Sequence, residues 1–565
     1  MDSYLILTII VTLLILLFIK ARLDAAKAER EAVRDLIEGF GKKGVRHYEE
    51  GEYALLSRYY AIKDRSRPGV IDDITWSDLN MDSVLPVIDR TMSQTGGEYL
   101  YDLMRSVVSA KEQGERSLPE RSRVIRFFLE NERERVLCQK AFYAMGKTQD
   151  YSVSDCIRFL DDVREEGNGW HFFCLLFGIL SISMIFVSPP VGFVLMLLST
   201  AVNVVTYFKR KSEITPYIVC FMFILRAMRE SQPLLKEEIP DLKAYQDRLK
   251  DALNKLKPLN RNTFLLMSGR RLTGSILELP MDYLRVYFHL DLIKFNRMLK
   301  TAKANRPALD DLYCVIGFLD SMISAASFRK SLDYATEPVF VEEEGTVFEV
   351  EELFHPLLKE PVPANISAHG GVLVTGSNAS GKSTFLKSVA LAALLGQTIC
   401  TVPGKSCRMS HFLIYSSMSL RDDILAGESY YMVEIRSMKR IMDAVRNSSN
   451  ILCFVDEVLR GTNTVERIAA SAHILKSLSG SRSLCFAATH DIELTYMLED
   501  IYENYHFSEE YRNNQISFDY QLLPGRAESR DAIRLLDMIG YDSTLTEAAF
   551  ATSEEFLETG VWPKL

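Results

Sequence analysis

Two apolar stretches in the first 210 residues of the chain are long enough to cross a membrane. Ser3 to Ile19 has seventeen residues without a charge, about 26 Å as an α-helix, against roughly 30 Å of bilayer hydrocarbon. Trp170 to Phe208 has thirty-nine residues without Asp, Glu, Lys or Arg, interrupted only at Ser188-Pro189-Pro190. No polar residue recurs there at a helical period, as it would in a buried pair of soluble helices. The pattern predicts a membrane anchor at residues 1–20 and a membrane hairpin at residues 170–208.

A secretory signal peptide is the alternative interpretation of the first stretch. Asp2 precedes it without any Lys or Arg, and no small-x-small cleavage site follows it, so an uncleaved anchor is favoured. Basic residues, among them Lys20 and Arg22, follow the first span, and Lys209-Arg210-Lys211 follow the third. Because Lys and Arg concentrate on the cytoplasmic side, we expect a multi-pass protein of the cell membrane. Its amino terminus would lie outside, and residues from 209 onward would lie in the cytoplasm.

Apolar positions in the rest of the chain change period near residue 338. Residues 21–69 are charged and helix-favouring, which predicts a juxtamembrane helix and linker. Residues 70–338, apart from the hairpin, place apolar residues three or four apart, which is typical of a helix bundle. Residues 339–565 alternate short β-like runs with helical patterns. The expected fold class is therefore α + α/β, with a helical domain that carries membrane spans before an α/β domain.

Charge and cysteine content limit the partners and the compartment. The chain has 66 basic and 75 acidic residues among 565, a formal net charge of −9, so composition gives no support for nucleic-acid binding. Its nine cysteines are scattered, with no C-x-x-C pair. They are interpreted as reduced thiols in a protein that faces the cytoplasm.

A phosphate-binding loop follows a short apolar strand, Val372 to Thr375. The sequence that comes next is a complete G-x-x-x-x-G-K-[ST] with a helical pattern after it. In such a loop backbone N–H groups face phosphate oxygens, the lysine reaches the β and γ phosphates, and the serine hydroxyl ligates Mg²⁺. We expect ATP and Mg²⁺ as cofactors. The expected binding residues are Gly376, Ser377, Asn378, Ala379, Ser380, Gly381, Lys382, Ser383 and Thr384.

Two further strands end in side chains that suit ATP hydrolysis. The strand at residues 451–455 ends in Asp456 and Glu457, an acidic pair that would be costly to bury unless it served a cation. Asp456 is assigned to the metal together with Ser383, and Glu457 to orienting the attacking water. A strand at residues 484–488 leads to His490, which could sense the γ-phosphate, although a lone histidine is usually structural.

With these motifs in place, the chain resembles the MutS family, the ATPases of DNA mismatch repair. The resemblance is carried by GSNASGKST, DDILAGESYYMVEI, FVDEVLRGTNT and ATHDIEL in that order. Upstream, two segments starting at Ile74 and Leu319 are loosely similar to the two ends of the family's helical core and lever domain. The resemblance implies that residues 339–565 form a MutS-type P-loop ATPase domain of the ABC-like kind. It also implies that residues 70–338 form the core and lever domain, interrupted by the hairpin.

The resemblance further implies a homodimer with composite ATP sites. Ser429 of one subunit would approach the γ-phosphate held by Lys382 of the other, although an ordinary helix cap also explains Ser429. Asn378 would lie near the γ-phosphate, so the expected catalytic residues are Glu457, His490 and Asn378. The family's Ser-Thr-Phe stands here as Ser429-Tyr430-Tyr431. Only about fifty non-membrane residues precede Ile74, too few for the family's mismatch-reading domain, which we expect to be lacking.

Two functions stay open at this point. The first is a membrane-anchored ATPase that hydrolyses ATP in a dimer and binds double-stranded DNA, mismatched or branched, in DNA repair. The second is an ATP-driven membrane switch or scaffold that acts on unknown protein partners without DNA. An ABC-type transporter is disfavoured, because the chain has no LSGGQ-like signature and few polar residues in its spans.

Overall fold

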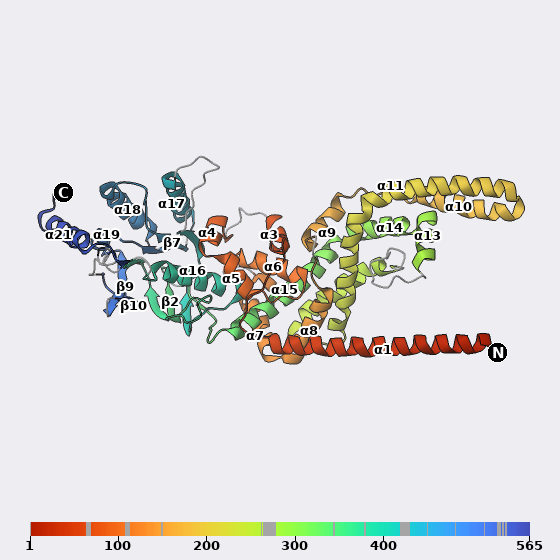
Figure 1. The fold of residues 1–565 in the computed structure, drawn as a ribbon, viewed down its shortest axis with the longest axis horizontal. Helices are drawn as coiled ribbons and strands as arrows, with labels where there is room; N and C mark the ends of the chain where they lie inside the picture. The colour runs from red at the N-terminus through yellow and green to blue at the C-terminus, as the bar shows by residue number, and fades with distance from the viewer. Residues whose placement is uncertain are drawn as a thin grey trace.

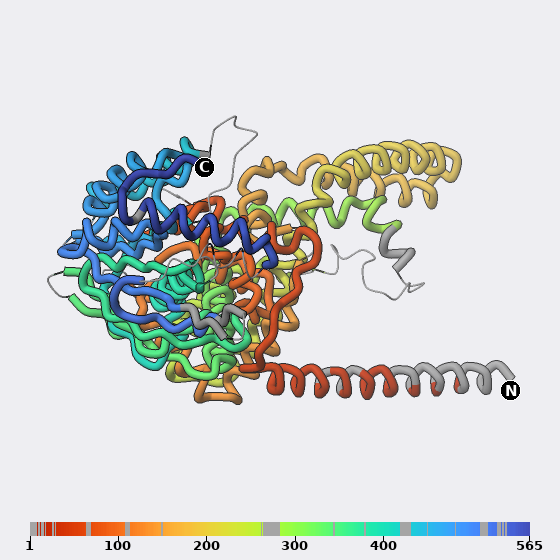
Figure 2. The backbone as a smooth tube through the Cα atoms, turned by 60° about the vertical axis from the view of Figure 1, so that its left-hand side comes forward, coloured from red at the N-terminus to blue at the C-terminus, as the bar shows by residue number. Residues whose placement is uncertain are grey.

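The computed structural model describes most of the chain. The described residues are 2–63, 69–107, 113–148, 151–261, 263, 278–342, 345–377, 380–418, 430–448, 450–480, 482–512, 515–527, 533, 536 and 539–565. The molecule is elongated, with the β-sheets at one end and long helices at the other (Figure 1). Both views show α1 and the α10–α11 hairpin extending from the same end of the body (Figures 1 and 2). This is the mixed helical and α/β fold that the sequence predicts.

Helices make up the part of the chain before residue 332. They are α1 (Asp2–Gly39), α2 (Glu52–Leu56), α3 (Arg58–Ala61), α4 (Asp73–Asp78), α5 (Met81–Ile88), α6 (Gln94–Met104), α7 (Leu118–Glu130), α8 (Glu132–Met145), α9 (Val153–Asp162), α10 (Gly169–Val187), α11 (Pro189–Glu230), α12 (Lys243–Leu256), α13 (Glu278–Phe288), α14 (Leu290–Ala304) and α15 (Arg306–Ser331). Short 3₁₀ turns lie at Gly114–Arg116, Gln232–Leu235, Pro240–Leu242 and Lys257–Asn260.

The core of this part is the contact between α15 and α6. Gly96 of α6 approaches Asp320 of α15 so closely that a Cβ on the glycine would lie 2.1 Å from Asp320 Oδ2. The buried Asp320 carboxylate accepts hydrogen bonds from the backbone N–H groups of Met92 and Ser93 and from the Ser93 hydroxyl. Ser93 in turn caps α6 by accepting from the N–H of Gly96, a favoured N-cap arrangement. A polar network therefore fixes the register of the two helices.

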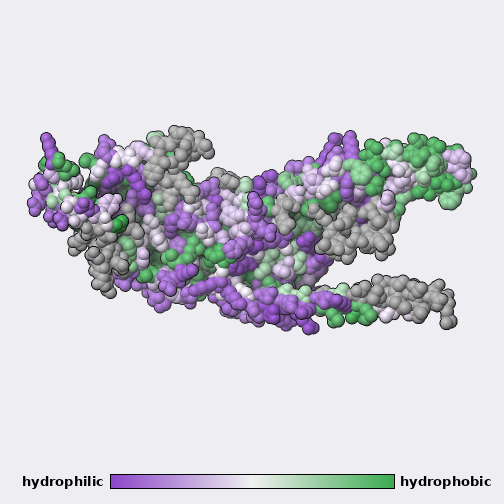
Figure 3. All heavy atoms as spheres, in the orientation of Figure 1, coloured by the Kyte–Doolittle hydropathy of each residue, from purple (hydrophilic) through white to green (hydrophobic). Residues whose placement is uncertain are grey.

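Three helices in the described part of the chain are long and apolar enough to cross a membrane: Gly169–Val187, Pro189–Leu235 and Arg306–Ser331. The last of these has 89% of its apolar window buried inside the protein, against 22% for each of the other two, so α15 is a core helix. The α10–α11 hairpin instead exposes most of its apolar side chains, which form a hydrophobic surface beyond the hydrophilic body (Figure 3). α11 continues through Lys209 to Glu230, and its last turns are buried.

The α/β part of the chain contains two sheets. Its elements are β1 (Val339–Phe340), β2 (Phe348–Leu353), β3 (Ala364–Ala368), β4 (Gly371–Thr375), α16 (Lys382–Ile399), β5 (Ser406–Met409), β6 (Leu413–Ser417), α17 (Tyr430–Asn447), β7 (Ile451–Asp456), α18 (Thr464–Leu478), β8 (Ser483–Ala488), α19 (Ile492–Met497), β9 (Tyr502–Arg512), β10 (Gln515–Pro524) and α21 (Ser543–Thr559). The larger sheet has the order β10-β9-β4-β8-β7-β6, and the smaller has the order β1-β5-β2-β3.

Parallel pairing in the larger sheet positions the site. β8 lies between β4 and β7, with Val374 opposite Ala488 and Ala488 opposite Asp456. These strands are buried apolar runs, as expected for parallel strands covered on both faces. Because their carboxyl ends meet at one edge, the segments that follow β4, β7 and β8 converge there.

Candidate functional site

The phosphate-binding loop connects β4 to α16. Gly376 has φ +138° and Gly381 has φ +108°, a backbone region that favours glycine. A Cβ on Gly376 would also lie 3.0 Å from the carbonyl oxygen of Phe507 in β9. The loop therefore needs glycine at both corners, and it delivers the chain to the N-terminus of α16. Asn378 and Ala379 lie outside the described residues.

Lys382 is the first residue of α16 and is folded back on its own loop. Its Nζ donates to the carbonyl oxygens of Gly376 at 2.8 Å and Ser377 at 2.6 Å, and the residue is only 5% exposed. The ammonium group thus lies among the backbone atoms that form the loop, where it can exchange a carbonyl for a phosphate oxygen. Ser380, Ser383 and Thr384 complete the described part of the loop and the first turn of the helix.

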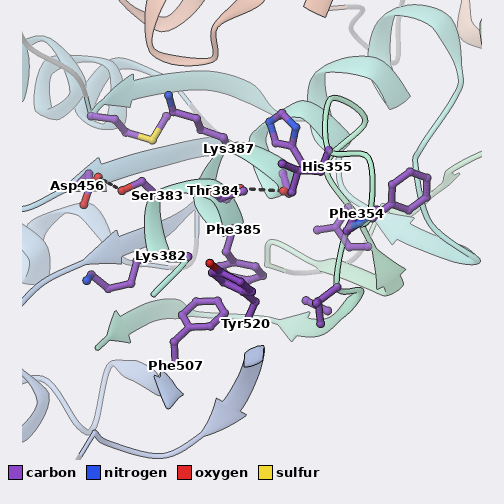
Figure 4. A pocket seen from close by; sticks show the side chains of 18 of the residues that line it. Phe354, His355, Lys382, Ser383, Thr384, Phe385, Lys387, Asp456, Phe507 and Tyr520 are labelled. Atoms are coloured by element: carbon purple, nitrogen blue, oxygen red, sulfur yellow. Dashed lines mark hydrogen bonds between the residues drawn. The ribbon is translucent and has the colours of Figure 1, made fainter. Parts of the chain in front are cut away.

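Oxygen donors meet beside Lys382. The Ser383 hydroxyl donates to Asp456 Oδ2 at 2.6 Å, joining α16 to the end of β7 (Figure 4). Hydroxyl and carboxylate oxygens are donors that Mg²⁺ accepts, and Mg²⁺ commonly takes one or two protein ligands beside waters and phosphates. No group of three or more His, Cys, Asp or Glu suited to a metal occurs among the described residues. The donors present therefore fit a magnesium ion shared with a nucleotide, and they do not fit an all-protein metal cage.

Glu457 is held at both carboxylate oxygens. Its Oε1 lies 2.9 Å from His490 Nε2, and its Oε2 lies 2.8 Å from Arg460 Nε. The hydrogen bond from His490 lowers the pKa of Glu457, partial burial opposes it, and the Arg460 charge lowers the pKa further. Glu457 also has φ +56°, an uncommon conformation for a residue other than glycine that is found at functional sites. The group is therefore an oriented anion at neutral pH.

A cavity of about 790 Å³ opens over these side chains, a volume within the usual range for small-molecule sites. It is lined by the loop with Asp456, Glu457 and His490, by Phe507 and Tyr520 close to the loop, and by Phe354 and His355 farther from Lys382 (Figure 4). Burial lowers the pKa of His355 to about 4, and the nearby Lys387 charge acts in the same direction, so His355 is neutral at pH 7. The cavity thus combines charged groups with aromatic rings, and this combination suits a nucleotide.

The structure places some expected residues together and adds others. Lys382, Ser383, Asp456, Glu457 and His490 all line the cavity. Ser429 lies outside the described residues, but α17, which begins just after it, returns to the site because Glu434 Oε1 accepts from the N–H of Arg460 at 3.0 Å.

Several residues line the cavity without having been expected there, among them Arg460, Phe354, His355 and Lys387. Arg460 lies four residues after Asp456, and Lys387 lies four residues, about one helical turn, after Ser383 in α16, so these spacings could have signalled both. Nothing in the spacing of Phe354 and His355 links them to the loop.

Comparisons with known proteins agree on the α/β part. Residues 372–557 match the family model of MutS domain V. The chain is 30% identical over 262 residues to a DNA mismatch repair protein MutS of Thermus thermophilus, covering 46% of this chain and 31% of that protein. It is 27% identical over 342 residues to the MutS protein of Thermus aquaticus, which covers 59% of this chain and 39% of that protein. It is 29% identical over 287 residues to the MutS protein of Bacillus subtilis, which covers 48% of this chain and 32% of that protein. The chain spans about a third of the length of the curated relatives it matches.

Proposed function

Because the chain belongs to the MutS family through its domain V, we propose that it is a membrane-anchored ATPase. Two copies would bind and hydrolyse ATP in their α/β parts, which would lie in the cytoplasm. The helical part would transmit the resulting change of shape to the membrane spans or to a bound partner. One observation carries this proposal: Lys382, the Ser383–Asp456 pair and the Glu457–His490 pair converge on one cavity from three adjacent parallel strands.

Each of these residues would have its own role in phosphoryl transfer. Lys382 would leave the carbonyls of Gly376 and Ser377 to bind the phosphates, and the N-terminus of α16 would favour their negative charge. Ser383 and Asp456 would hold Mg²⁺, which when bound neutralises charge on the phosphate oxygens. Glu457 would orient the attacking water, provided that one of its carboxylate oxygens is released from Arg460 or His490. Ser429 of the partner subunit and Asn378 would complete the site next to the γ-phosphate.

Contacts between the helices and the site support transmission of the nucleotide state. The Asp78 carboxylate of α4 accepts from the Ser416 hydroxyl at 2.7 Å and from the N–H of Met418 at 2.9 Å. Met418 lines the cavity. At the end of α15, Arg329 pairs with Glu337 and donates to the carbonyl of Cys400. A change of shape at the cavity can therefore reach α4 directly and α15 through the C-terminal end of α16.

The directions of α1 and of the hairpin support a common membrane plane. Both α1 and α11 pack on α8, and α1 and the α10–α11 hairpin extend from the same end of the molecule (Figure 1). The apolar stretches at residues 1–20 and 170–208 therefore lie on the same side of the body, as two anchors in one bilayer require.

The relatives and the charge of the chain favour different partners for the ATPase. The relatives are mismatch repair proteins, which supports double-stranded DNA as the partner of a dimer. The net charge of −9 and the exposed apolar hairpin favour the second candidate, a membrane switch that acts on proteins. Duplex binding that weakens steeply with salt would support DNA, and no binding at about 50 mM salt would support the switch.

Nucleotide binding tests the core of the proposal. The detergent-solubilised full chain should retain labelled ATP with Mg²⁺, and Lys382→Ala should lose that binding. Glu457→Gln should retain ATP without turnover, because the carboxamide keeps the size of the side chain but does not orient water as the anion does. Equal retention and equal hydrolysis in both variants would contradict the assignments.

A further inference from the structure

We propose that α13 lies in the plane of the membrane, within the cytoplasmic leaflet, as an interfacial helix that binds phospholipid. This proposal rests on the proposed membrane insertion of the α10–α11 hairpin. α13 packs against both α10 and α11. It runs across the axis of the hairpin and not along it (Figure 1). A short helix in that orientation cannot span a bilayer, but it can lie along one surface of it.

Tyr287, near the end of α13, fixes the helix to the hairpin. Its hydroxyl lies 2.7 Å from Ser199 Oγ of α11 and 3.1 Å from Ser181 Oγ of α10. Asn203 Nδ2 donates to the carbonyl of Tyr287 at 2.8 Å. A Cβ on Gly178 would lie 2.8 Å from Tyr287 Cε1, so glycine allows the ring to approach α10. The three hydroxyls and the Asn203 Nδ2 group thus have hydrogen-bond partners, which polar side chains within a bilayer require.

The same contacts give the depth of α13. Asn203 stands five residues before Phe208, the end of the charge-free stretch, so the carbonyl of Tyr287 lies about 7 Å below that limit. Ser199 stands nine residues before Phe208 and Ser181 eleven residues after Trp170, so the hydroxyl of Tyr287 reaches about 14 to 17 Å. Interfacial helices bury their apolar faces about 5 to 10 Å into the boundary between headgroups and acyl chains. The backbone carbonyl of Tyr287, near the end of α13, falls within that range.

The outward face of α13 carries apolar side chains. Tyr283 is 75% exposed and Leu284 is 43% exposed, while Arg285 is buried. The hairpin that α13 packs against also exposes apolar residues, among them Leu176 and Leu180. Tyrosine is enriched at membrane interfaces, where its ring lies among acyl chains and its hydroxyl reaches the headgroups. The occupant that fits this face is therefore the phospholipid that surrounds the hairpin.

α13 is joined to the helices that reach the ATPase. It ends at Phe288, and the φ of +53° at His289 turns the chain directly into α14. The Tyr207 hydroxyl of α11 donates to Asp291 Oδ2 at 2.9 Å, and Lys211 pairs with the same carboxylate, so the start of α14 is held at the level of the headgroups. α15 follows α14 and ends at the contacts of Arg329 with the α/β part. Phospholipid bound at α13 therefore lies at one end of a continuous helical path to the ATP site.

Depth-dependent fluorescence quenching tests the proposal on the full chain in vesicles of phosphatidylcholine and phosphatidylglycerol. Tyr283→Cys and Leu284→Cys would each carry an environment-sensitive label, with the wild-type chain as the blank for native cysteines. Leu197→Cys, at an exposed site midway along the hairpin, is the lipid control, and Tyr143→Cys, at an exposed site of α8, is the aqueous control. We expect labels at 283 and 284 to be quenched about twofold more by a spin label near the headgroup than by one deep in the acyl chain.

The controls separate this proposal from the proposed function. If labels at 283 and 284 behave like the label at 143 while the label at 197 is quenched by lipid, α13 is outside the membrane and the inference is wrong. If they match the label at 197 in depth, the in-plane placement is wrong. If the label at 197 is also aqueous, the hairpin itself does not insert, and the membrane part of the proposed function fails together with the inference.

Discussion

His490 Nε2 lies 2.9 Å from Glu457 Oε1, and this contact joins the ends of the adjacent parallel strands β7 and β8. The imidazole orients the carboxylate and lowers its pKa. The pair therefore links the residue proposed to orient the attacking water to one that could respond to the γ-phosphate.

The first prediction concerns this pair. In His490→Ala, Glu457 loses its first partner, so we expect kcat to fall about 10- to 100-fold, in the range for positioned acid–base groups, with ATP retention nearly unchanged. Because the pKa of Glu457 rises towards its ordinary value in the variant, the acid limb of the pH–rate profile should move to higher pH. Steady-state ATPase assays between about pH 4 and 8 measure both effects. An unshifted acid limb would assign that limb to another group.

The second prediction concerns the metal ligands. Ser383→Ala removes the hydroxyl that contacts Asp456 Oδ2, so the Mg²⁺ concentration for half-maximal ATPase activity should rise about tenfold or more. Ser477→Ala, at an exposed site of α18, is the matched control and should leave the requirement unchanged. Titration of activity with Mg²⁺ at fixed ATP measures the difference. Identical titration curves for the two variants would contradict the assignment of Ser383 as a metal ligand.

The third prediction concerns Asp320 and pH. Burial raises the pKa of Asp320 to about 6 from an ordinary value near 3.8, although hydrogen bonds from Ser93 and Met92 oppose the rise. The folded chain thus binds this proton more tightly than the unfolded chain, and the free energy of unfolding should fall as pH rises from about 4 to 6, by up to about 3 kcal/mol. Asp320→Asn should flatten that part of the dependence. Thermal unfolding midpoints across this range measure it, with the exposed Asp310→Asn as the control.

The fourth prediction concerns the contact between α6 and α15. A Cβ at residue 96 would meet the Asp320 carboxylate at 2.1 Å, so Gly96→Ala must displace one helix. We expect a loss of about 1 to 3 kcal/mol or more, seen as a fall of several degrees in the unfolding midpoint of the detergent-solubilised chain. Gly114→Ala is unsuited as a control because its φ of +65° would add strain. Gly167→Ala meets no atom within 4 Å and should unfold like the wild type.

The fifth prediction concerns the anchors. A chain without residues 1–20 should stay in the membrane fraction after alkaline extraction, because the α10–α11 hairpin retains an apolar exposed surface that lipid would cover. Recovery of this truncated chain in the soluble fraction would contradict insertion of the hairpin.

The sequence predicts the strands that position the site because each is a short, mostly apolar run followed by polar or charged residues. β4, β7 and β8 fall at these runs, and their parallel register brings Lys382, Asp456 and His490 to one edge. The salt bridge of Arg460 to Glu457 was not foreseen, since it depends on the positive φ values of Glu457 and Leu459. His355 and Phe354 escaped notice because only the fold brings the end of β2 across to the phosphate loop.

The sequence did not predict the full length of α11. Lys209, Arg210 and Lys211 mark the edge of the apolar stretch, and an edge in hydropathy carries no information about where a helix ends. α11 therefore passes through them without interruption to Glu230. The helical pattern of residues 70–338 covers α13, but it does not reveal that Tyr287 contacts Ser181 and Ser199 of the hairpin.

The course of α11 has a mechanical consequence. The helix is 42 residues long, and in its second half it turns away from the axis of the hairpin to pack on α8 (Figure 1). Pro216 is the one proline inside the helix beyond its first turn, and an internal proline is a common cause of a bend. Because continuous helix joins the two arms, a displacement of the arm that packs on α8 would tilt the hairpin about this bend.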